Sequence, residues 1–146
     1  MTIKLTKAQT KALNNLACNG PQECGTAALR TATATVLAKH GLAEVHNFRP
    51  GYADQYFDCF TRSWRYDKHI PSETTYRVTL AGREWLAAHG HVDQIAYLEE
   101  EAAHAENMAS TWAAPNKFRD ANAGEALAWK MKAAEIRNTT ASLTAK

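Results

Sequence analysis

The sequence predicts a mainly α-helical fold with a small antiparallel β region in its middle and a helical hairpin at its C-terminal end. Three observations predict it. Apolar residues recur at helical spacing through residues 6–40. Residues 42–48 and 75–78 alternate as strands do, and Pro and Gly residues lie between them. Beyond residue 90 the apolar positions follow heptad spacing, which is typical of paired helices.

The first helix is predicted to begin after Thr6. Thr6 and Gln9 have the spacing of a capping box. In this motif the side chain of each residue accepts a hydrogen bond from the backbone N–H of the other. Gly20 and Pro21 are expected to end this helix. The side chains expected on its buried side are Ala12, Leu13, Leu16 and Ala17.

A second helix is predicted from Thr26 to His40, with Gly41 after its last turn. A helical projection gives this helix two distinct sides. The inward side is expected to hold Leu29, Ala32, Val36, Leu37 and His40. The outward side is expected to hold Ala27, Thr31, Ala34, Thr35 and Ala38.

The middle of the chain reads as strands and turns. A strand is predicted over residues 42–48 and a turn over 49–52. A segment rich in aromatic and cationic residues follows over 56–66, then a turn near 70–72 and a strand over 75–78. Thr79 is then expected to cap a short helix from Leu80 to His89, which Gly90 closes.

The C-terminal part, residues 91–146, is predicted to form two helices separated near Pro115, with an N-cap at Asn122. Its first heptad seam consists mainly of alanine, which permits close helix approach. The two helices are suited to pair within one chain or across the two-fold axis of a dimer. We expect a homodimer with Ile95, Leu98, Trp112, Trp129 and Ile136 in or near its interface.

The composition is that of an ordinary globular chain. Of 146 residues, 45% are apolar and 22% are charged, and the mean hydropathy is −0.45, which excludes disordered, collagen-like and membrane classes. The N-terminal residues lack the apolar core of a signal peptide, so we expect a cytoplasmic protein without membrane partners. Cys18, Cys24 and Cys59 are an odd number without paired spacing, which predicts free thiols.

Charge is distributed unevenly along the chain. The formal net charge is +2, but residues 1–90 carry 11 Lys and Arg against 7 Asp and Glu, and residues 91–146 carry 6 against 8. The N-terminal part is therefore the cationic one. Residues 93–106 hold acids and no Lys or Arg, whereas residues 117–146 have an excess of cations, so we expect these two segments to attract each other.

Residues 5–89 resemble a known family. The helix with Thr31 to Leu37, the Gly41-Leu42 pair after it, and the block Tyr76-Arg77-Val78-Thr79-Leu80-Ala81-Gly82 are similar to winged helix-turn-helix regulators of the MarR-like sort. The resemblance implies a winged helix-turn-helix domain over residues 1–90, with a small antiparallel β wing, followed by the C-terminal hairpin as a separate unit. The short connector at residues 21–25 and the long wing, residues 49–74, depart from the family pattern.

The resemblance also implies double-stranded DNA as the partner and a role in transcriptional regulation. In that family the second helix enters the major groove and the wing lays cations along the backbone. The implied contacts on the helix are Arg30, Thr31, Thr35 and Lys39. The implied phosphate contacts in the wing are Arg49, Arg62, Arg65, Lys68 and His69, with Trp64 and Tyr66 as packing or stacking groups.

A second interpretation stays open. A helix face of Ala and Thr lacks the Arg, Asn and Gln side chains that make bidentate base contacts, so it is equally suited to pack against protein. In the wing, Asp58 and Asp67 partly offset the cations. The alternative function is a winged-helix interaction module, of the phage or plasmid accessory type, that binds and inhibits a host protein.

Metal-site patterns are incomplete. His89, His91 and Asp93 have the His-x-His-x-Asp spacing of metallo-β-lactamase-like hydrolases, but Gln94 stands where that family has another His, and Gly90 is better interpreted as a helix stop. The other zinc-binding residue types, which lack a Cys-x-x-Cys anchor, are Cys18, Cys24, His40 and His46. We predict no metal and no cofactor.

Enzyme motifs are missing from the sequence. It has no phosphate loop, no nucleophile elbow and no His-Glu-x-x-His helix. The three consecutive acids at residues 99–101 spread around a helix and are typical of a solvated face. We therefore predict that the chain is not an enzyme.

Overall fold

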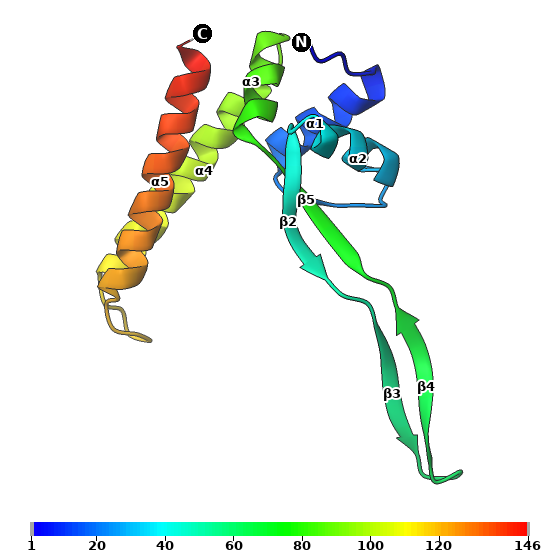
Figure 1. Ribbon diagram of the computed structural model, residues 1–146. Coiled ribbons are helices and arrows are strands. Elements are labelled where there is room, and N and C mark those ends of the chain that lie inside the picture. The colour runs from blue at the N-terminus through cyan, green and yellow to red at the C-terminus, as the bar shows by residue number, and fades with distance from the viewer. Residues whose placement is uncertain (1, 146) are drawn as a thin grey trace.

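The computed structural model describes residues 2–145, except for the side chains of residues 66–69. These residues form five helices and two small antiparallel sheets, which confirms the coarse fold class (Figure 1). The elements in chain order are α1 (Lys7–Asn19), β1 (Gln22–Glu23), α2 (Thr31–Lys39), β2 (Ala43–Arg49), β3 (Tyr52–Asp58), β4 (Ser63–Ile70), β5 (Glu73–Val78), α3 (Leu80–Ala88), α4 (Asp93–Ala113) and α5 (Ala123–Thr144). None of the described helices combines the length and the apolar run that a membrane span needs.

Helix α1 begins and ends as its sequence predicts. The backbone N–H of Gln9 donates to Thr6 Oγ1 at 3.3 Å, and the Thr6 N–H donates to Gln9 Oε1 at 2.9 Å. The helix ends at Gly20, whose φ of +79° is a conformation that other residues rarely adopt. The predicted apolar side is confirmed as buried.

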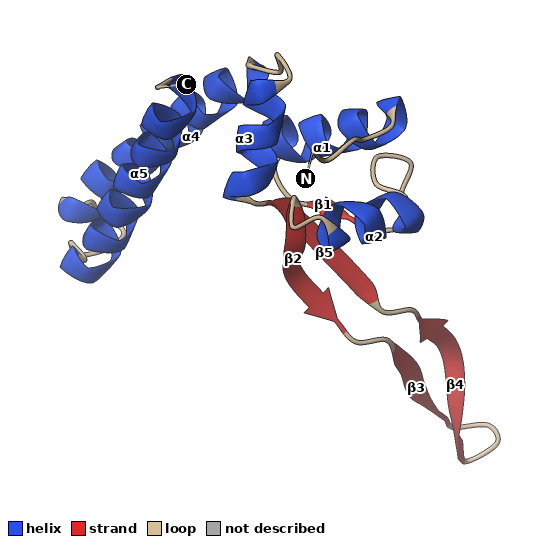
Figure 2. Cartoon of the chain, turned by 45° about the horizontal axis from the view of Figure 1, so that its top comes forward, coloured by secondary structure: helices blue, strands red, loops and turns tan. Residues whose placement is uncertain are grey.

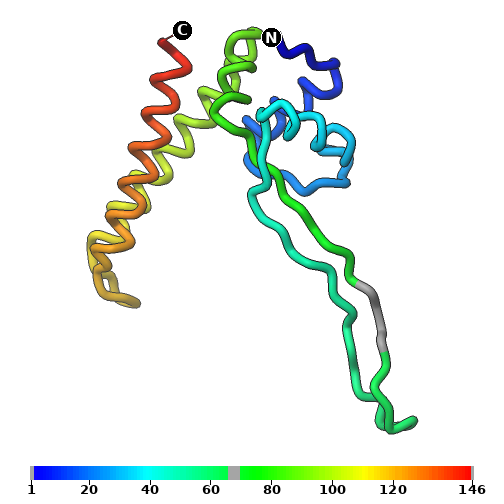
Figure 3. Tube along the Cα trace, in the orientation of Figure 1, coloured from blue at the N-terminus to red at the C-terminus, as the bar shows by residue number. Residues whose placement is uncertain are grey.

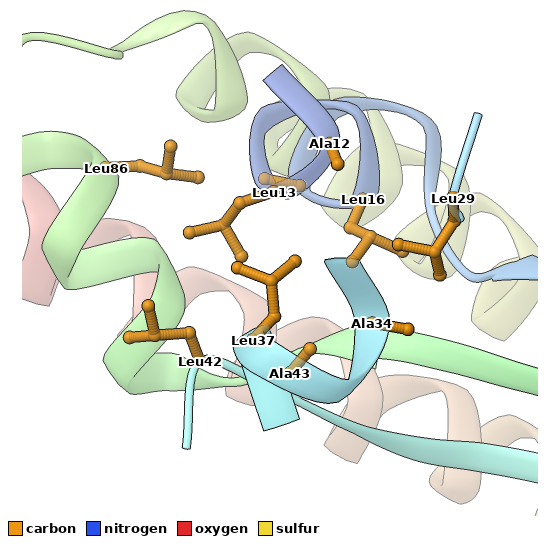
Figure 4. Close-up of a cluster of buried hydrophobic side chains, with 10 residues drawn as sticks. Ala12, Leu13, Leu16, Leu29, Ala34, Leu37, Leu42, Ala43 and Leu86 are labelled. Carbon is orange, nitrogen blue, oxygen red and sulfur yellow. The ribbon is translucent and has the colours of Figure 1, made fainter. Parts of the chain in front are cut away.

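The main core lies where α1, α2 and α3 meet. Figure 4 shows its leucines converging from these elements and from the start of β2. Its fully buried leucines are Leu13, Leu16, Leu29, Leu37, Leu42 and Leu86. Close packing of these side chains supplies the apolar burial that stabilises the N-terminal unit.

A three-stranded antiparallel sheet in the order β1-β5-β2 borders this core. The sequence analysis did not predict β1, whose Gln22 lies opposite Tyr76 and Glu23 opposite Thr75. Two residues give no alternation pattern to read, so pairing with β5 alone defines this strand. β2 and β5 pair along their length with an irregularity between Val45 and Asn47.

Beyond the sheet, residues 50–72 form a long two-stranded projection, which we call the arm. β3 and β4 pair only with each other, and the ribbon runs away from the helical body (Figure 1 and Figure 3). The turns predicted at 49–52 and 70–72 are wrong, because the chain continues through Pro50 and Pro71 and reverses only between β3 and β4. Proline lacks a donor for the strand ladder, so the two prolines interrupt the pairing without reversing the chain.

The helices α4 and α5 form an antiparallel hairpin within one chain, which projects from the body in another direction than the arm (Figure 2). Their seam buries the predicted Leu98, Ala102, Ala105 and Ala109 of α4. The Asn122 side chain accepts from the Glu125 N–H at 3.0 Å, which confirms the predicted cap of α5. Arg137 of α5 donates to Glu106 of α4 at 3.1 Å, in line with the expected attraction between the two helices.

A buried polar cluster joins the two halves. Gln94 of α4 is fully buried; its amide nitrogen donates to the Arg83 carbonyl at 2.8 Å and to the His91 carbonyl at 3.3 Å. The Arg83 guanidinium donates to the Ala17 carbonyl at 3.1 Å and to Gln94 Oε1 at 3.4 Å. Burial lowers the pKa of Arg83 from its ordinary value. The cluster therefore ties α1, α3 and α4 to one another.

Helix α3 approaches β2 at Gly82, and this contact generates the first prediction. A Cβ at Gly82 would lie 2.2 Å from the Leu42 carbonyl oxygen, which is backbone and cannot move aside. We expect Gly82→Ala to destabilise the protein by about 1–3 kcal/mol through overpacking. Denaturant unfolding of the purified variant measures this change.

Gly124 provides the matched control, since it also lies in the first turn of a helix. A Cβ there would meet only Asn122 Oδ1 at 3.4 Å. Gly124→Ala should leave stability unchanged or raise it by up to about 1 kcal/mol, because alanine favours helix. Equal effects of the two substitutions would contradict the close approach of α3 to Leu42.

The polar cluster generates the second prediction. Gln94→Leu removes the acceptor of one guanidinium hydrogen bond and the side-chain donor to the Arg83 and His91 carbonyls, and it places an apolar side chain at a fully buried polar position. We expect a loss of about 1–3 kcal/mol in the free energy of unfolding. Asn138→Leu, on the exposed surface of α5, should change stability by no more than about 0.5 kcal/mol. A Gln94→Leu protein as stable as the Asn138→Leu protein would disprove the role of the cluster.

Candidate nucleic-acid interface

Helix α2 is shorter than predicted. It begins at Thr31, and residues 24–29 form turns and bends. The Thr26 hydroxyl donates to the Glu23 carbonyl at 3.0 Å and accepts from the Leu29 N–H at 3.3 Å, so local side-chain bonds replace a helical turn. Leu29 is buried as the anchor of this turn.

The shorter helix also turns a different side inward. Ala34, expected on the outward side, is 1% exposed and packs with Leu37. Ala32 and His40, expected inward, are exposed. The expectation for these three residues is wrong because the projection treated Leu29 as part of the helix. In the structure Leu29 lies before α2, and the side of α2 that faces the core is the one with Ala34 and Leu37.

The four candidate contacts on this helix are all exposed. Thr31, Thr35 and Lys39 are spaced by four residues and therefore line one side of α2. Arg30 precedes the helix as its N-cap and makes no capping hydrogen bond with its side chain. The Thr35 hydroxyl donates to the Thr31 carbonyl at 2.9 Å, which leaves its methyl group and its acceptor capacity facing solvent.

A groove of about 810 Å³ lies between α1 and the residues that lead into α2. Its lining includes Lys11, Asn15 and Asn19 of α1, and Arg30 and Thr33 on the opposite side. None of the described residues that line it is acidic. The arrangement offers two cations and several amide groups to an anion.

The sequence analysis missed this groove, although two signals point to it. Lys7, Lys11, Asn15 and Asn19 recur every fourth residue and so share one side of α1. Residues 2–43 carry five Lys and Arg against the single acid Glu23. The cationic excess of the N-terminal unit is therefore concentrated on the helical body.

Most of the remaining candidate DNA contacts lie on the arm, which has a lower net charge than the helical body. Residues 50–72 hold three cations and three acids. Arg49 at the end of β2 and Arg62 near the tip are exposed, and Arg62 has a φ of +50°. Arg65 forms an ion pair with Asp58 at 3.3 Å. The side chains of Tyr66, Lys68 and His69 lie outside the described residues.

The predicted dimer contacts lie along the intramolecular hairpin. Leu98 is 4% exposed within the single chain, whereas Ile95, Trp112, Trp129 and Ile136 are half-buried. The Arg119 guanidinium lies 3.7 Å from the centre of the Trp112 ring, and the His104 ring meets Trp129 edge-on at 5.9 Å. Much of this seam is therefore covered by the chain itself.

The histidines and cysteines considered for zinc lie apart from any cluster. Among the residues whose side chains are described, no group of three or more His, Cys, Asp and Glu residues is placed to hold a metal ion. The His89 ring stacks on Trp85 at 3.8 Å, and its Nδ1 lies 2.7 Å from the Trp85 carbonyl oxygen. His89 thus belongs to the end of α3.

The chain was compared with protein families, curated proteins and solved structures. No family model, no curated protein and no solved structure matches this chain.

Cys18 in the groove gives a prediction about thiol reactivity. Burial raises the pKa of the Cys18 thiol, Asp93 raises it further, and Arg83 opposes this. A raised pKa means less thiolate at neutral pH, so we expect iodoacetamide to modify Cys18 more slowly than the exposed Cys59. Mass spectrometry of the alkylated peptides over a pH series measures both rates.

The unfolded protein is the control for this experiment, since both thiols should react alike once burial is lost. Alkylation of Cys18 in the folded protein at the rate of Cys59 would contradict the burial of the groove floor.

Proposed function

We propose that this protein binds double-stranded DNA and acts in transcriptional regulation, with α2 as the recognition helix of a winged helix-turn-helix unit. The observation that carries the proposal is the acid-free groove of α1 and α2, which lies beside the exposed Thr31–Lys39 side of α2. Cations with no compensating acid attract the phosphate backbone, and this attraction supplies most of non-specific DNA affinity.

The element order supports the proposal. α2 is followed directly by β2, and β5 leads directly into α3, as the resemblance to winged helix-turn-helix regulators implies. The strand β1 lies between α1 and α2 and pairs with β5, so one sheet holds both ends of the arm against the helices. In this proposal the arm takes the place of the wing.

Each exposed group then has a role. Lys11 and Arg30 contact phosphates from the two walls of the groove, and Lys39 contacts the backbone at the other end of α2. The methyl groups of Thr31 and Thr35 suit the methyl group of thymine, and their oxygens accept from base edges. Arg49 at the end of β2 and Arg62 on the arm add further contacts with the DNA backbone.

Fluorescence anisotropy with a labelled random duplex tests the proposal. We expect binding that weakens between about 50 and 200 mM salt, and the substitution of Lys11, Arg30 and Lys39 by Ala should lower the log–log salt slope by about one unit per lost phosphate contact. Arg62→Ala combined with Arg65→Ala should have a smaller effect, since Arg65 is paired with Asp58.

Lys130→Ala combined with Lys132→Ala is the control, because both cations lie on α5 and outside the proposed interface. A loss of DNA affinity in this control equal to that of the groove variant would show that charge alone matters. Absence of binding at low salt would refute the proposal and favour the interaction module, whose contacts with protein depend less on salt.

A further inference from the structure

The tip of the arm presents one phenylalanine to solvent. β3 ends at Asp58 and β4 begins at Ser63, which lies opposite Asp58, so residues 59–62 form the turn between the two strands. Phe60 in this turn is 95% exposed, more than any other large apolar side chain that the structure describes. The turn lies at the end of the arm that is farthest from the helical body (Figure 1 and Figure 3).

Hydrogen bonds order this turn. Asp58 Oδ1 accepts from the Phe60 N–H at 2.9 Å and from the Thr61 N–H at 3.5 Å. The hydroxyl oxygens of Thr61 and Ser63 lie 2.8 Å apart. The other carboxylate oxygen of Asp58 pairs with Arg65 Nε at 3.3 Å, so the charge of Asp58 is compensated within the arm. Phe60 therefore projects from an ordered turn.

Arg62 follows in an unfavourable backbone conformation. Its φ of +50° lies in the left-handed region, where glycine is favoured because a Cβ crowds the following carbonyl oxygen. Arg62 is exposed, and it forms no ion pair with another described residue. No contact within the described chain thus offsets the cost of arginine at this position. A strained residue without an internal partner suits a contact with a ligand.

We propose that the tip of the arm enters the minor groove of DNA, where Phe60 inserts between two base pairs and bends the duplex. The proposal rests on the DNA binding proposed above and adds bending to it. Proteins that bend DNA in this way insert an apolar side chain between base steps, which unstacks the bases and kinks the duplex. Arg62 lies beside this wedge, and the negative potential of a narrow minor groove attracts its guanidinium.

The place of the arm in the fold favours DNA over a protein surface as the partner of Phe60. β2 follows α2 directly, so the arm continues from the proposed recognition helix. Residues 50–60 span about 30 Å at roughly 3.3 Å per residue, close to the roughly 34 Å of one turn of B-DNA. With α2 in the major groove, the tip can therefore reach a minor groove within about one turn. Residues 59–66 contain two cations and no acid, so this end of the arm does not repel phosphates.

Energy transfer between dyes at the two ends of a duplex of about 40 base pairs tests the proposal, because free DNA of this length is nearly straight. We expect the transfer to rise when the wild-type protein binds at low salt. Phe60→Ala should lose at least about half of this rise. Binding to the same duplex, measured by anisotropy, should persist in Phe60→Ala because the cations of the groove supply most of the affinity.

The matched control is Phe118→Ala, which truncates another exposed phenylalanine. Phe118 is 85% exposed and lies in the loop between α4 and α5, outside the proposed interface. Phe118→Ala should retain the full rise in energy transfer. Permanganate oxidation of unstacked thymines in the bound duplex gives a second measurement, and we expect it with the wild type and with Phe118→Ala but not with Phe60→Ala.

Arg62→Gly tests the second group of the tip. Glycine adopts the left-handed conformation without strain, so this variant should not unfold at a lower denaturant concentration than the wild type. We expect it to bend DNA less than the wild type, because the cation beside the wedge is lost.

The outcomes separate this proposal from the proposed function. DNA that the wild type binds without bending, or that Phe60→Ala bends to more than half the wild-type extent, would overturn the wedge and leave DNA binding intact. An equal loss of bending in Phe118→Ala, or unchanged bending in Arg62→Gly, would also overturn the proposal. Absence of DNA binding at low salt would refute both.

Discussion

The hydrogen bonds of Gln94 constrain the placement of every element after the sheet. A buried amide that loses its partners costs more free energy than a typical hydrogen bond contributes, so the arrangement that satisfies it is strongly preferred. Gln94 meets Arg83 of α3, and Arg83 in turn meets the carbonyl at the end of α1. These bonds hold the N-terminal end of α4 against the body and thereby set the direction in which the helical hairpin leaves it.

As a result of this placement, the charged groups and the exposed apolar groups lie on different parts of the molecule. The helical body has the cationic groove, the hairpin covers its own alanine seam, and the arm has exposed aromatic rings without net charge. Electrostatic attraction to an anion and apolar contact thus belong mainly to different segments. The proposed DNA-binding surface therefore lies mainly on the helical body.

Much of the fold could be predicted where local interactions decide it. The capping box of α1, the Thr79 cap of α3 and the Asn122 cap of α5 each depend on residues within three positions of one another, and the structure has all three. The start of α2 and strand β1 were not predicted. Each depends on a partner distant in sequence: burial of Leu29 in the core, and pairing of Gln22 with Tyr76.

The candidate site likewise has features that could be predicted from local sequence and features that depend on distant contacts. Exposure of Arg30, Thr31, Thr35 and Lys39 could be expected from the helical pattern, but Ala34 was assigned to the wrong side. The groove escaped prediction because its two walls come from α1 and from the residues before α2, which only the folded core brings together.

The sequence by itself determined the helices, their caps, the heptad seams and the cationic bias of the N-terminal unit, because these follow from spacing and from contacts between near neighbours. Only the tertiary structure decided that the hairpin closes within one chain, that the prolines extend the ribbon rather than reverse it, and that the arm runs away from the helical body. These features depend on strand register and on packing between distant segments, where the free energy of burial outweighs local preference.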